Sequence, residues 1–411
     1  MALQRELTLN EAEARHSARV HDLLAREIAA AGGWISFERF MDLALYAPGL
    51  GYYSAGAHKL GVGGDFTTAP EMSNLYGACL ARQCEEVLRA LGAGSILEIG
   101  AGSGRLAADI LARLESLGRL PAEYWILEIS ADLRERQRRC LEQRVPHLTG
   151  RVRWLERPPE EPFDGIVLAN EVLDALPVIR FRWYADRVEE LGVTLHDGRF
   201  DWAPRPASPA VAEACRQLSA VGGAGAGDAG GRDSRAGDTF GGFNWDDGYV
   251  SEYCPRLPAW THSVTGSLRA GAALWFDYGL PRSQYYLAER HEGTLICHFR
   301  QRAHGDPFLH PGLQDITAWV DFTRLAEASR PAGFDLAGFC TQAFFLAGAG
   351  IDQEMRLIAG QDENVFARLA HQARQLMLPG EMGERFKAMA WLRGMDVPLS
   401  GFALQDLRHT L

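Results

Sequence analysis

SILEIGAGSG, residues 95–104, decides the fold. It opens as a short apolar run typical of a buried strand and ends with glycines at positions 100, 102 and 104. Apolar residues then recur at helical spacing from Leu106 to Leu114. Glycines at a strand-to-helix turn permit positive φ and let a ligand approach the backbone closely. The stretch therefore predicts a ligand-binding turn in an α/β protein.

The alternation of strand and helix continues on both sides of this turn. Ser130 can cap the helix after the second strand, and Ser36 can cap the second of two helices within residues 15–45. Such alternation predicts a doubly wound parallel α/β sheet covered by helices on both faces, with a helical N-terminal addition and C-terminal helices. The remaining strands are predicted at 124–128, 152–155, 165–169, 272–277, 295–299 and 339–345, and helices at 315–330 and 350–395.

Changes in composition along the chain suggest three parts. We expect residues 1–74 to form the N-terminal addition, residues 75–346 the sheet domain, and residues 347–411 a C-terminal helical segment. The glycine-rich stretch 219–248 has the composition of a flexible surface insertion. Residues 46–71 combine glycine with aromatics and lack periodicity, which is typical of a functional loop.

The overall composition limits the class of protein. At about 150 residues per domain, 411 residues suggest two or three packed domains. With 42 basic and 53 acidic residues the net charge is −11, which disfavours nucleic acid and anionic membranes as partners. Seven cysteines without a C-x-x-C pair disfavour a disulfide framework or a zinc site. Residues 1–16 resemble no secretory signal and no apolar run could span a bilayer, so we expect a cytoplasmic bacterial protein.

The glycine turn is compatible with several ligands. A phosphate-binding P-loop requires a Gly-Lys-Ser/Thr sequence, which is absent here. A dinucleotide fingerprint requires a third glycine where this chain has Arg105. The spacing E-x-G-x-G-x-G, which begins at Glu98, instead matches sites for nucleoside methyl donors. A tight turn that binds no ligand is the alternative.

Glu128 follows the second predicted strand, 24 residues beyond Gly104. A carboxylate at this place in a doubly wound fold can accept both ribose hydroxyls of a bound nucleoside. Alternatively, the acid favours the N-terminus of the following helix. Its position relative to the glycine turn makes ribose binding the preferred interpretation.

Polar residues also follow the fourth strand, in ANEVLDALP at 169–177. Ligands of open α/β sheets bind at the carboxyl ends of strands, so Asn170, Glu171 and Asp174 are predicted at the mouth of the site. Carboxylates there could attract a cationic methyl donor and orient a basic nucleophile. The alternative is helix capping by Asn170, with the acids in the first helical turn.

Four histidines lie close together in sequence, but no pair has the spacing of metal ligands, so we expect no metal. They are His291, His298, His304 and His310.

Taken together, these residues resemble the MidA family of class I S-adenosylmethionine-dependent methyltransferases. GDFTTAPEMS (64–73) and LANEVLDALPV (168–178) are far more specific than the glycines. The family typically has Pro at Ala101, Arg at Ser103 and two aromatics at Val172-Leu173; the last difference could reshape the acceptor pocket. Further matching blocks, which span nearly the whole chain, are 37–54, 96–104, 276–281, 306–326 and 382–391.

The resemblance implies a seven-stranded sheet, S-adenosyl-L-methionine as cofactor and a protein arginine side chain as acceptor. It also implies a lid at 64–71, where Glu71 and hydroxyl side chains would cover the sulfonium end; a stabilised loop is the alternative. The family's mitochondrial member assists complex I assembly, so we expect a protein substrate such as a respiratory-complex subunit, and a homodimer is compatible with the pattern. An assembly factor with weak or no catalysis is the rival function. The predicted catalytic residues are Glu171, Asp174 and Asp65, and the predicted cofactor-binding residues are Glu98, Gly100, Ala101, Gly102, Gly104, Glu128, Ile129, Asn170, Thr67, Thr68 and Pro70.

Overall fold

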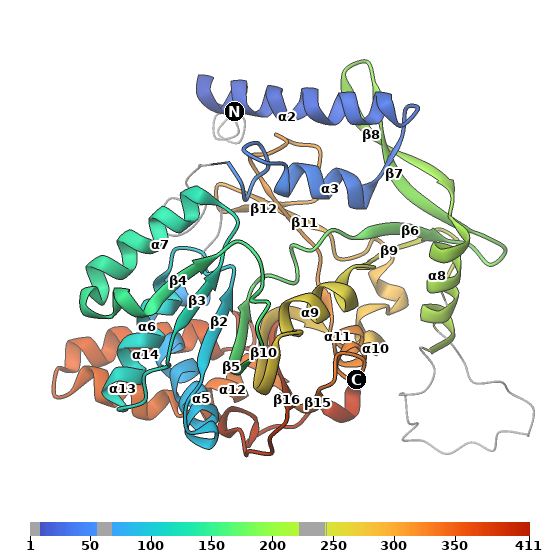
Figure 1. The fold of residues 1–411 in the computed structure, drawn as a ribbon. Coiled ribbons are helices and arrows are strands. Elements are labelled where there is room, and N and C mark those ends of the chain that lie inside the picture. Colours follow the sequence, from blue (N-terminus) through green and yellow to red (C-terminus); the bar gives the residue numbers. More distant parts are fainter. Residues whose placement is uncertain (1–8, 56–67, 222–242, 244) are drawn as a thin grey trace, which may run out of the picture. The chain divides into compact units, whose positions relative to one another are not determined.

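The computed structural model describes residues 9–55, 68–221, 243 and 245–411 (Figure 1). The chain divides into two compact units, each built from separate stretches of sequence. No helix among the described residues is long and apolar enough to cross a membrane. Unit 1 comprises Met1–His58, Ala175–Pro255 and Arg282–Ala318, and unit 2 comprises Lys59–Asp174, Arg256–Pro281 and Trp319–Leu411.

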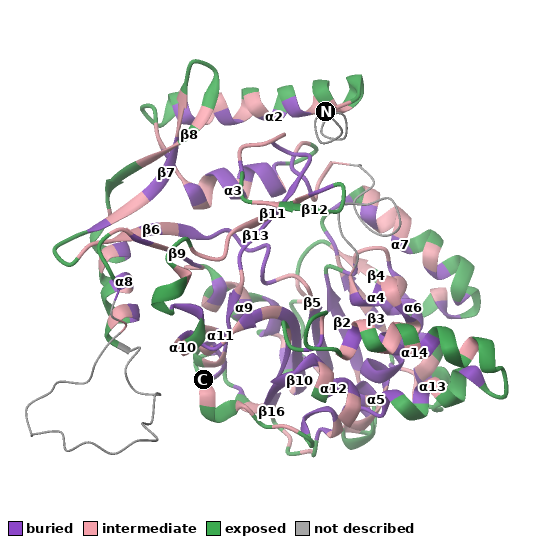
Figure 2. Cartoon of the chain, turned by 180° about the vertical axis from the view of Figure 1, so that it is seen from behind, coloured by how far each residue is buried: buried purple, intermediate pink, exposed green. Residues whose placement is uncertain are grey.

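Unit 2 contains an eight-stranded sheet whose central strands, β2, β5 and β10, are mostly buried (Figure 2). Its main path has the order β15-β16-β10-β5-β2-β3-β4, and β14 pairs with the end of β10. The strands from β4 to β10 are parallel, whereas β16 is antiparallel to both of its neighbours. The strands are β2 (Ser95–Ile99), β3 (Tyr124–Leu127), β4 (Val152–Leu155), β5 (Phe163–Asn170), β10 (Leu268–Leu280), β14 (Val320–Asp321), β15 (Asp335–Thr341) and β16 (Phe386–Arg393).

Consecutive strand residues point to opposite faces of this sheet, so both faces carry apolar side chains. Helices cover both faces. Phe276 of β10 packs against Tyr76 and Phe345 on one face, and Trp275 packs against Trp260 on the other. The first face carries α4 (Ala69–Met72), α5 (Asn74–Leu91), α6 (Arg105–Ser116), α7 (Ala131–Arg144), α12 (Gln342–Gly348), α13 (Ile351–Ala359) and α14 (Glu363–Met377), and the second carries α9 (Leu257–Thr265) and α11 (Phe322–Ser329).

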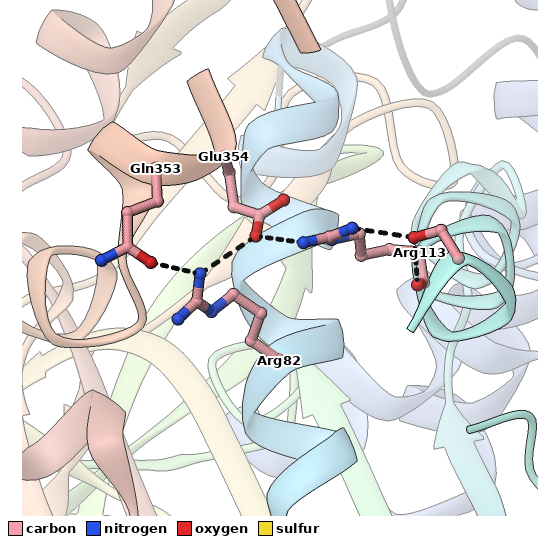
Figure 3. Close-up of polar contacts among 5 residues, drawn as sticks. Arg82, Arg113, Gln353 and Glu354 are labelled. Carbon is pink, nitrogen blue, oxygen red and sulfur yellow. Dashed lines mark hydrogen bonds and ion pairs between the residues drawn. The ribbon is translucent and has the colours of Figure 1, made fainter. Parts of the chain in front are cut away.

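A buried ion-pair network joins the C-terminal helices to the sheet domain. The Glu354 carboxylate of α13 lies between two guanidinium groups, at 3.3 Å from Arg82 of α5 and 2.8 Å from Arg113 of α6 (Figure 3). Arg82 also donates a 2.8 Å hydrogen bond to the Gln353 side chain. Charged hydrogen bonds of this kind are about twice as strong as neutral ones. They therefore fix α13 on α5 and α6 within unit 2.

Unit 1 contains two antiparallel sheets and the N-terminal helices. Asn10 and Glu13 form a capping box at α2 (Glu11–Ala30), and the Ser36 side chain caps α3 (Phe37–Tyr46). One sheet has the order β1-β7-β6-β9, with β8 paired to β7, and the other has the order β12-β11-β13. The other elements are β1 (Ile35–Ser36), β6 (Ile179–Trp183), β7 (Val188–His196), β8 (Arg199–Pro206), α8 (Pro209–Val221), β9 (Tyr249–Tyr253), α10 (Arg282–Tyr285), β11 (Ile296–Phe299), β12 (Arg302–His304) and β13 (Asp315–Thr317).

The predicted α/β class, the first four strands, the fifth strand at 272–277 and the two N-terminal helices are confirmed. The prediction of helix throughout 350–395 is wrong, because Phe386–Arg393 is β16, a strand inside the sheet. Helix is also absent from the first part of 315–330, where β13 and β14 lie. The predicted strand at 295–299 exists, but it belongs to the small sheet of unit 1. In 339–345, β15 ends at Thr341 and α12 follows.

The predicted three-part division also differs from the observed architecture. Residues 175–255 and 282–318, which were assigned to one continuous sheet domain, fold with the N-terminal helices as unit 1. Their pairing partners are distant in sequence, as in the pairing of Ile35 with Val193, so local patterns do not reveal it. Most of the predicted insertion at 219–248 lies outside the described residues.

Candidate functional site

The glycine turn after β2 has the positive φ angles that its sequence predicts. Gly100, Gly102 and Gly104 have φ values of 65°, 54° and 85°, a region that favours glycine. A Cβ added at Gly104 would lie 2.8 Å from the Gln137 Cα, so α7 packs directly against the turn. Any larger residue at position 104 must displace backbone atoms.

Gln137 of α7 connects this turn to Glu128. The fully buried Gln137 amide donates to the Gly102 carbonyl at 3.1 Å and to the Glu128 carboxylate at 3.2 Å. Its own oxygen accepts a 2.9 Å hydrogen bond from the Trp154 indole. One side chain thus fixes the distance between the glycine turn and the acid after β3.

Glu128 and Ile129 form a polar and apolar pair at the end of β3. Burial raises the pKa of Glu128, although hydrogen bonds from the Ser130 N–H and Gln137 oppose that shift. Glu128 is only 7% exposed, whereas the neighbouring Ile129 side chain is 58% exposed. The carboxylate could accept hydrogen bonds from sugar hydroxyls, and the exposed apolar side chain beside it could cover the adjoining aromatic base. These residues therefore fit a nucleoside.

Glu98 lies deeper than the other predicted residues. It is 2% exposed, and its carboxylate accepts a 2.7 Å hydrogen bond from the Tyr124 hydroxyl. Burial raises the pKa of Glu98 to about 7. The structure thus places this acid among the buried core side chains of β2 and β3, and its predicted contact with a cofactor stays a prediction.

The strand-end segment, residues 170–174, begins at the last residue of β5 and carries the predicted acids. Glu171 has φ 53°, which is uncommon for a residue with a side chain, and its N–H donates to the Phe276 carbonyl at 2.8 Å. The next three N–H groups, those of residues 172–174, donate to one Asp277 carboxylate oxygen at 3.1, 2.8 and 3.3 Å. The other Asp277 oxygen accepts from the Tyr278 N–H at 2.9 Å. Two consecutive residues of β10 therefore hold the backbone of this segment.

A chain of side-chain hydrogen bonds reaches the same segment from α5. The buried Tyr76 hydroxyl donates to the Asn170 side chain at 2.5 Å, and Asn170 in turn donates to the Glu171 carboxylate at 3.2 Å. Burial, together with the charges of Glu171 and Asp277, raises the pKa of Tyr76, so its hydroxyl stays a donor. The Ala69 N–H of α4 also donates to Glu171, at 3.4 Å. Asn170 therefore orients an acid, and it does not cap a helix, because turns and bends rather than a helix separate β5 from β6.

The described end of the predicted lid contacts the glycine turn. Thr68 precedes α4, and Pro70 occupies its first turn as expected. The Glu71 carboxylate accepts from the Ser103 hydroxyl, and its carbonyl accepts from the Arg105 guanidinium at 2.9 Å. These bonds fix α4 to the turn. Asp65 and Thr67 lie outside the described residues.

Sequence reasoning assigned no role to Asp277, Tyr76 or Gln137. Asp277 could have been found by the rule that identified Glu171, because it also lies near the carboxyl end of a parallel strand. The glycine turn, Glu128 and the strand-end segment all lie in unit 2. A Cβ at Gly100 would lie 3.2 Å from the Val172 side chain, so the segment directly adjoins the turn.

Comparisons with known proteins show which family and which proteins the chain resembles. Residues 79–340 match the model of a family described as putative S-adenosyl-L-methionine-dependent methyltransferases. The chain is 30% identical to the mitochondrial protein arginine methyltransferase NDUFAF7 of Danio rerio, over 89% of this chain and 84% of that protein. It is 28% identical to the Homo sapiens protein of the same name, over 88% and 80% of the two chains.

Two crystal structures from Burkholderia thailandensis share the whole fold. One, a likely methyl transferase bound to S-adenosyl-homocysteine, is 42% identical with a TM-score of 0.89 and covers 98% of this chain and 99% of its own. The other, the native structure of an uncharacterized protein, has the same identity and coverage with a TM-score of 0.86.

Proposed function

We propose, from the premise that the chain belongs to the MidA family of S-adenosyl-L-methionine-dependent methyltransferases, that its acceptor is an arginine side chain of a protein. The observation that carries the proposal is the strand-end segment, which contains Glu171 and Asp174 and whose Val172 side chain would lie 3.2 Å from a Cβ at Gly100 of the glycine turn. Relatives that bear the name protein arginine methyltransferase support the same acceptor.

The chemistry of arginine explains why carboxylates suit this place. A guanidinium group has a pKa of about 12.5 or above and is protonated at neutral pH, so it must lose a proton as it is methylated. Glu171 would orient one of its nitrogens through charged hydrogen bonds and accept that proton, and Asp174 would add negative charge that favours a cationic acceptor. Bound S-adenosylmethionine supplies the methyl group together with its own leaving group. The chain's main task is then alignment, which can contribute about 7–11 kcal/mol to the rate.

The remaining predicted residues divide the cofactor among them. Glu128 would accept the ribose hydroxyls, and Ile129 would cover one face of the base. Backbone groups of Gly100 to Gly104 would approach the amino acid tail, for which positive φ leaves room. Thr68 and Pro70 would close the sulfonium end together with Asn170. Asp65 and Thr67 are proposed for the same end from the resemblance alone.

A cytoplasmic protein is the proposed substrate. The predicted respiratory-complex subunit and the predicted homodimer stay predictions. The rival function, an assembly factor that binds the cofactor without turnover, differs in one measurable respect, which is the transfer of the methyl group.

Two experiments test the proposal. Calorimetry should detect S-adenosylhomocysteine binding that Gly102→Val and Glu128→Ala abolish, and unchanged affinity in both variants would contradict the assigned site. Labelled methyl groups should then pass from the donor to lysate proteins and be recovered as methylarginine. Glu171→Gln should lower this rate by about 100-fold or more while the affinity for S-adenosylhomocysteine is kept.

Glu160→Gln is a matched control, since Glu160 is an exposed acid outside the site. Its labelling should equal that of the wild type. Equal labelling by Glu171→Gln would remove Glu171 from the mechanism. Binding of S-adenosylhomocysteine without labelling by the wild type would favour the assembly factor, and methyl groups recovered on another side chain would refute the arginine assignment.

A further inference from the structure

We propose that Asp277 is a positioning residue of the methyl-transfer site, which holds the strand-end segment in the conformation that presents Glu171 and Asp174. The inference rests on the proposed function, in which these two acids meet the acceptor. Nothing in the motif that contains Asp277, FDYGLP at 276–281, predicts this role.

The Asp277 side chain anchors the strand-end segment through one of its oxygens, and its other oxygen is also hydrogen-bonded. Asp277 is fully buried, and within the part of the chain that the structure describes, both of its oxygens accept hydrogen bonds only from backbone N–H groups. One oxygen collects three successive N–H groups, as in the backbone nests that bind anions, but here the anion is part of the protein. Each N–H would otherwise be a buried donor that needs an acceptor. The carboxylate therefore substitutes for a ladder partner where the strand has ended.

An ion pair with a positively charged side chain does not explain why the Asp277 carboxylate is buried. Among the described residues, no arginine or lysine forms an ion pair with Asp277. Lys387 is its register partner on β16, but the Lys387 ammonium donates to the Glu384 carbonyl. Burial first, and then the charges of Asp174 and Glu171, raise the pKa of Asp277. A buried carboxylate among other acids is costly, so general stabilisation is a poor account of its presence.

The anchor instead accounts for the strained backbone at Glu171. Left-handed φ at a residue with a side chain persists only where the surroundings enforce it. The Glu171 N–H is bonded to Phe276 on one side of the strained residue, and the next three N–H groups are bonded to Asp277 on the other. These bonds determine the directions in which the Glu171 and Asp174 side chains leave the backbone. Loss of the anchor should thus misplace both acids without touching the glycine turn.

Asp277→Asn tests the inference with a side chain of nearly the same shape. An amide has one accepting oxygen and one donating NH₂ group, and both ends of this site present N–H donors. In either orientation of the amide, its NH₂ group faces a backbone N–H group on one side, and two donors then meet. We expect kcat to fall by about 100-fold, as for a small misplacement of reacting groups, while the affinity for S-adenosylhomocysteine changes less than about threefold.

Glu354→Gln is the matched control, because Glu354 is another buried carboxylate of unit 2 whose partners are two arginines. It should lower the melting temperature and leave kcat unchanged. If both variants lose kcat only in proportion to the folded fraction, Asp277 is structural and the inference is overturned. Wild-type activity in Asp277→Asn would overturn it as well.

Hydrogen exchange supplies a readout that needs no acceptor protein. In the wild type, the N–H groups of residues 172–174 should exchange slowly, and in Asp277→Asn faster than the amides of the glycine turn. Rapid exchange of the three groups in the wild type would overturn the anchor. If the wild type transfers no methyl group, the proposed function fails, and the exchange result still decides whether Asp277 holds the segment.

Discussion

The two halves of the site are held by different kinds of side chain. The neutral amide of Gln137 joins the glycine turn to Glu128, and positive φ there falls on glycines. The Asp277 carboxylate holds the strand-end segment, where positive φ falls on Glu171. The first half requires little conformational or desolvation free energy, because its polar groups are hydrogen-bonded and its glycines adopt positive φ readily. The second concentrates charge and strain, which is where reacting groups are expected. Affinity and turnover should therefore respond to different substitutions.

The largest expected effect is on the cofactor half. Gly104→Val would place a Cβ 2.8 Å from the Gln137 Cα and 3.1 Å from its carbonyl oxygen, at a φ of 85°. We expect the affinity for S-adenosylhomocysteine to fall by at least about 100-fold, or about 3 kcal/mol, by calorimetry. Gly118→Val is the control, since Gly118 has φ 66° but its Cβ would meet nothing within 4 Å. Equal affinities for the two variants would show that α7 moves to make room for the new side chain. The division of the site into two halves would then be contradicted.

The next effect concerns an acid that belongs to neither half. The folded-state pKa of Glu98 is about 7, against an ordinary value of 4.5, so the folded state binds this proton more tightly than the unfolded state. Its contribution to the free energy of unfolding is thus complete below about pH 4.5 and is lost as the pH rises through about 7, by on the order of 3 kcal/mol. Urea unfolding of the wild type and Glu98→Gln at pH 5 and pH 8 measures this contribution.

Glu98→Gln should remove that part of the pH dependence, because its amide carries no titrating proton. Identical pH slopes in the two proteins would contradict the raised pKa. The same variant decides the predicted cofactor contact. A large loss of affinity for S-adenosylhomocysteine would bring Glu98 into the cofactor half, whereas an unchanged affinity would leave it in the core with Tyr124.

The smallest effect sharpens the role of Gln137. Gln137→Leu keeps most of the volume but cannot donate to Gly102 or Glu128, and it leaves the Trp154 N–H without its acceptor. We expect about tenfold weaker binding of S-adenosylhomocysteine, equivalent to about 1.4 kcal/mol, with kcat unchanged at saturating donor. Gln217→Leu, on the exposed side of α8, should change neither quantity. A fall in kcat without a change in affinity would reverse the assignment of Gln137.

Local patterns predicted the places of the glycine turn, of Glu128 and of the acids after β5, and they missed the side chains that hold these groups, Gln137 and Asp277. The glycine turn and the acid after β3 follow from short-range spacing, and the structure has both where expected. Asp277 could not be assigned a role, because its partners are about a hundred residues away and become neighbours only when β10 pairs with β5. Phe386–Arg393 was mistaken for helix because a short apolar run has no distinguishing period, and only the pairing with β10 and β15 makes it a strand. Glu98 is the converse case, since its spacing suggests a ligand and its burial places it in the core, while its contact with the cofactor stays a prediction.

The interleaving of the two units constrains how this chain can be made. Continuous excision of either unit is impossible, because the path passes between them at residues 58/59, 174/175, 255/256, 281/282 and 318/319. β16, which ends at Arg393, inserts between β10 and β15. Until the ribosome has released that strand, β10 and β15 have an open seam where the sheet should be continuous. Synthesis must therefore pass Arg393 before this sheet can close, and premature termination near residue 380 would leave the facing edges of β10 and β15 unpaired and exposed to aggregation.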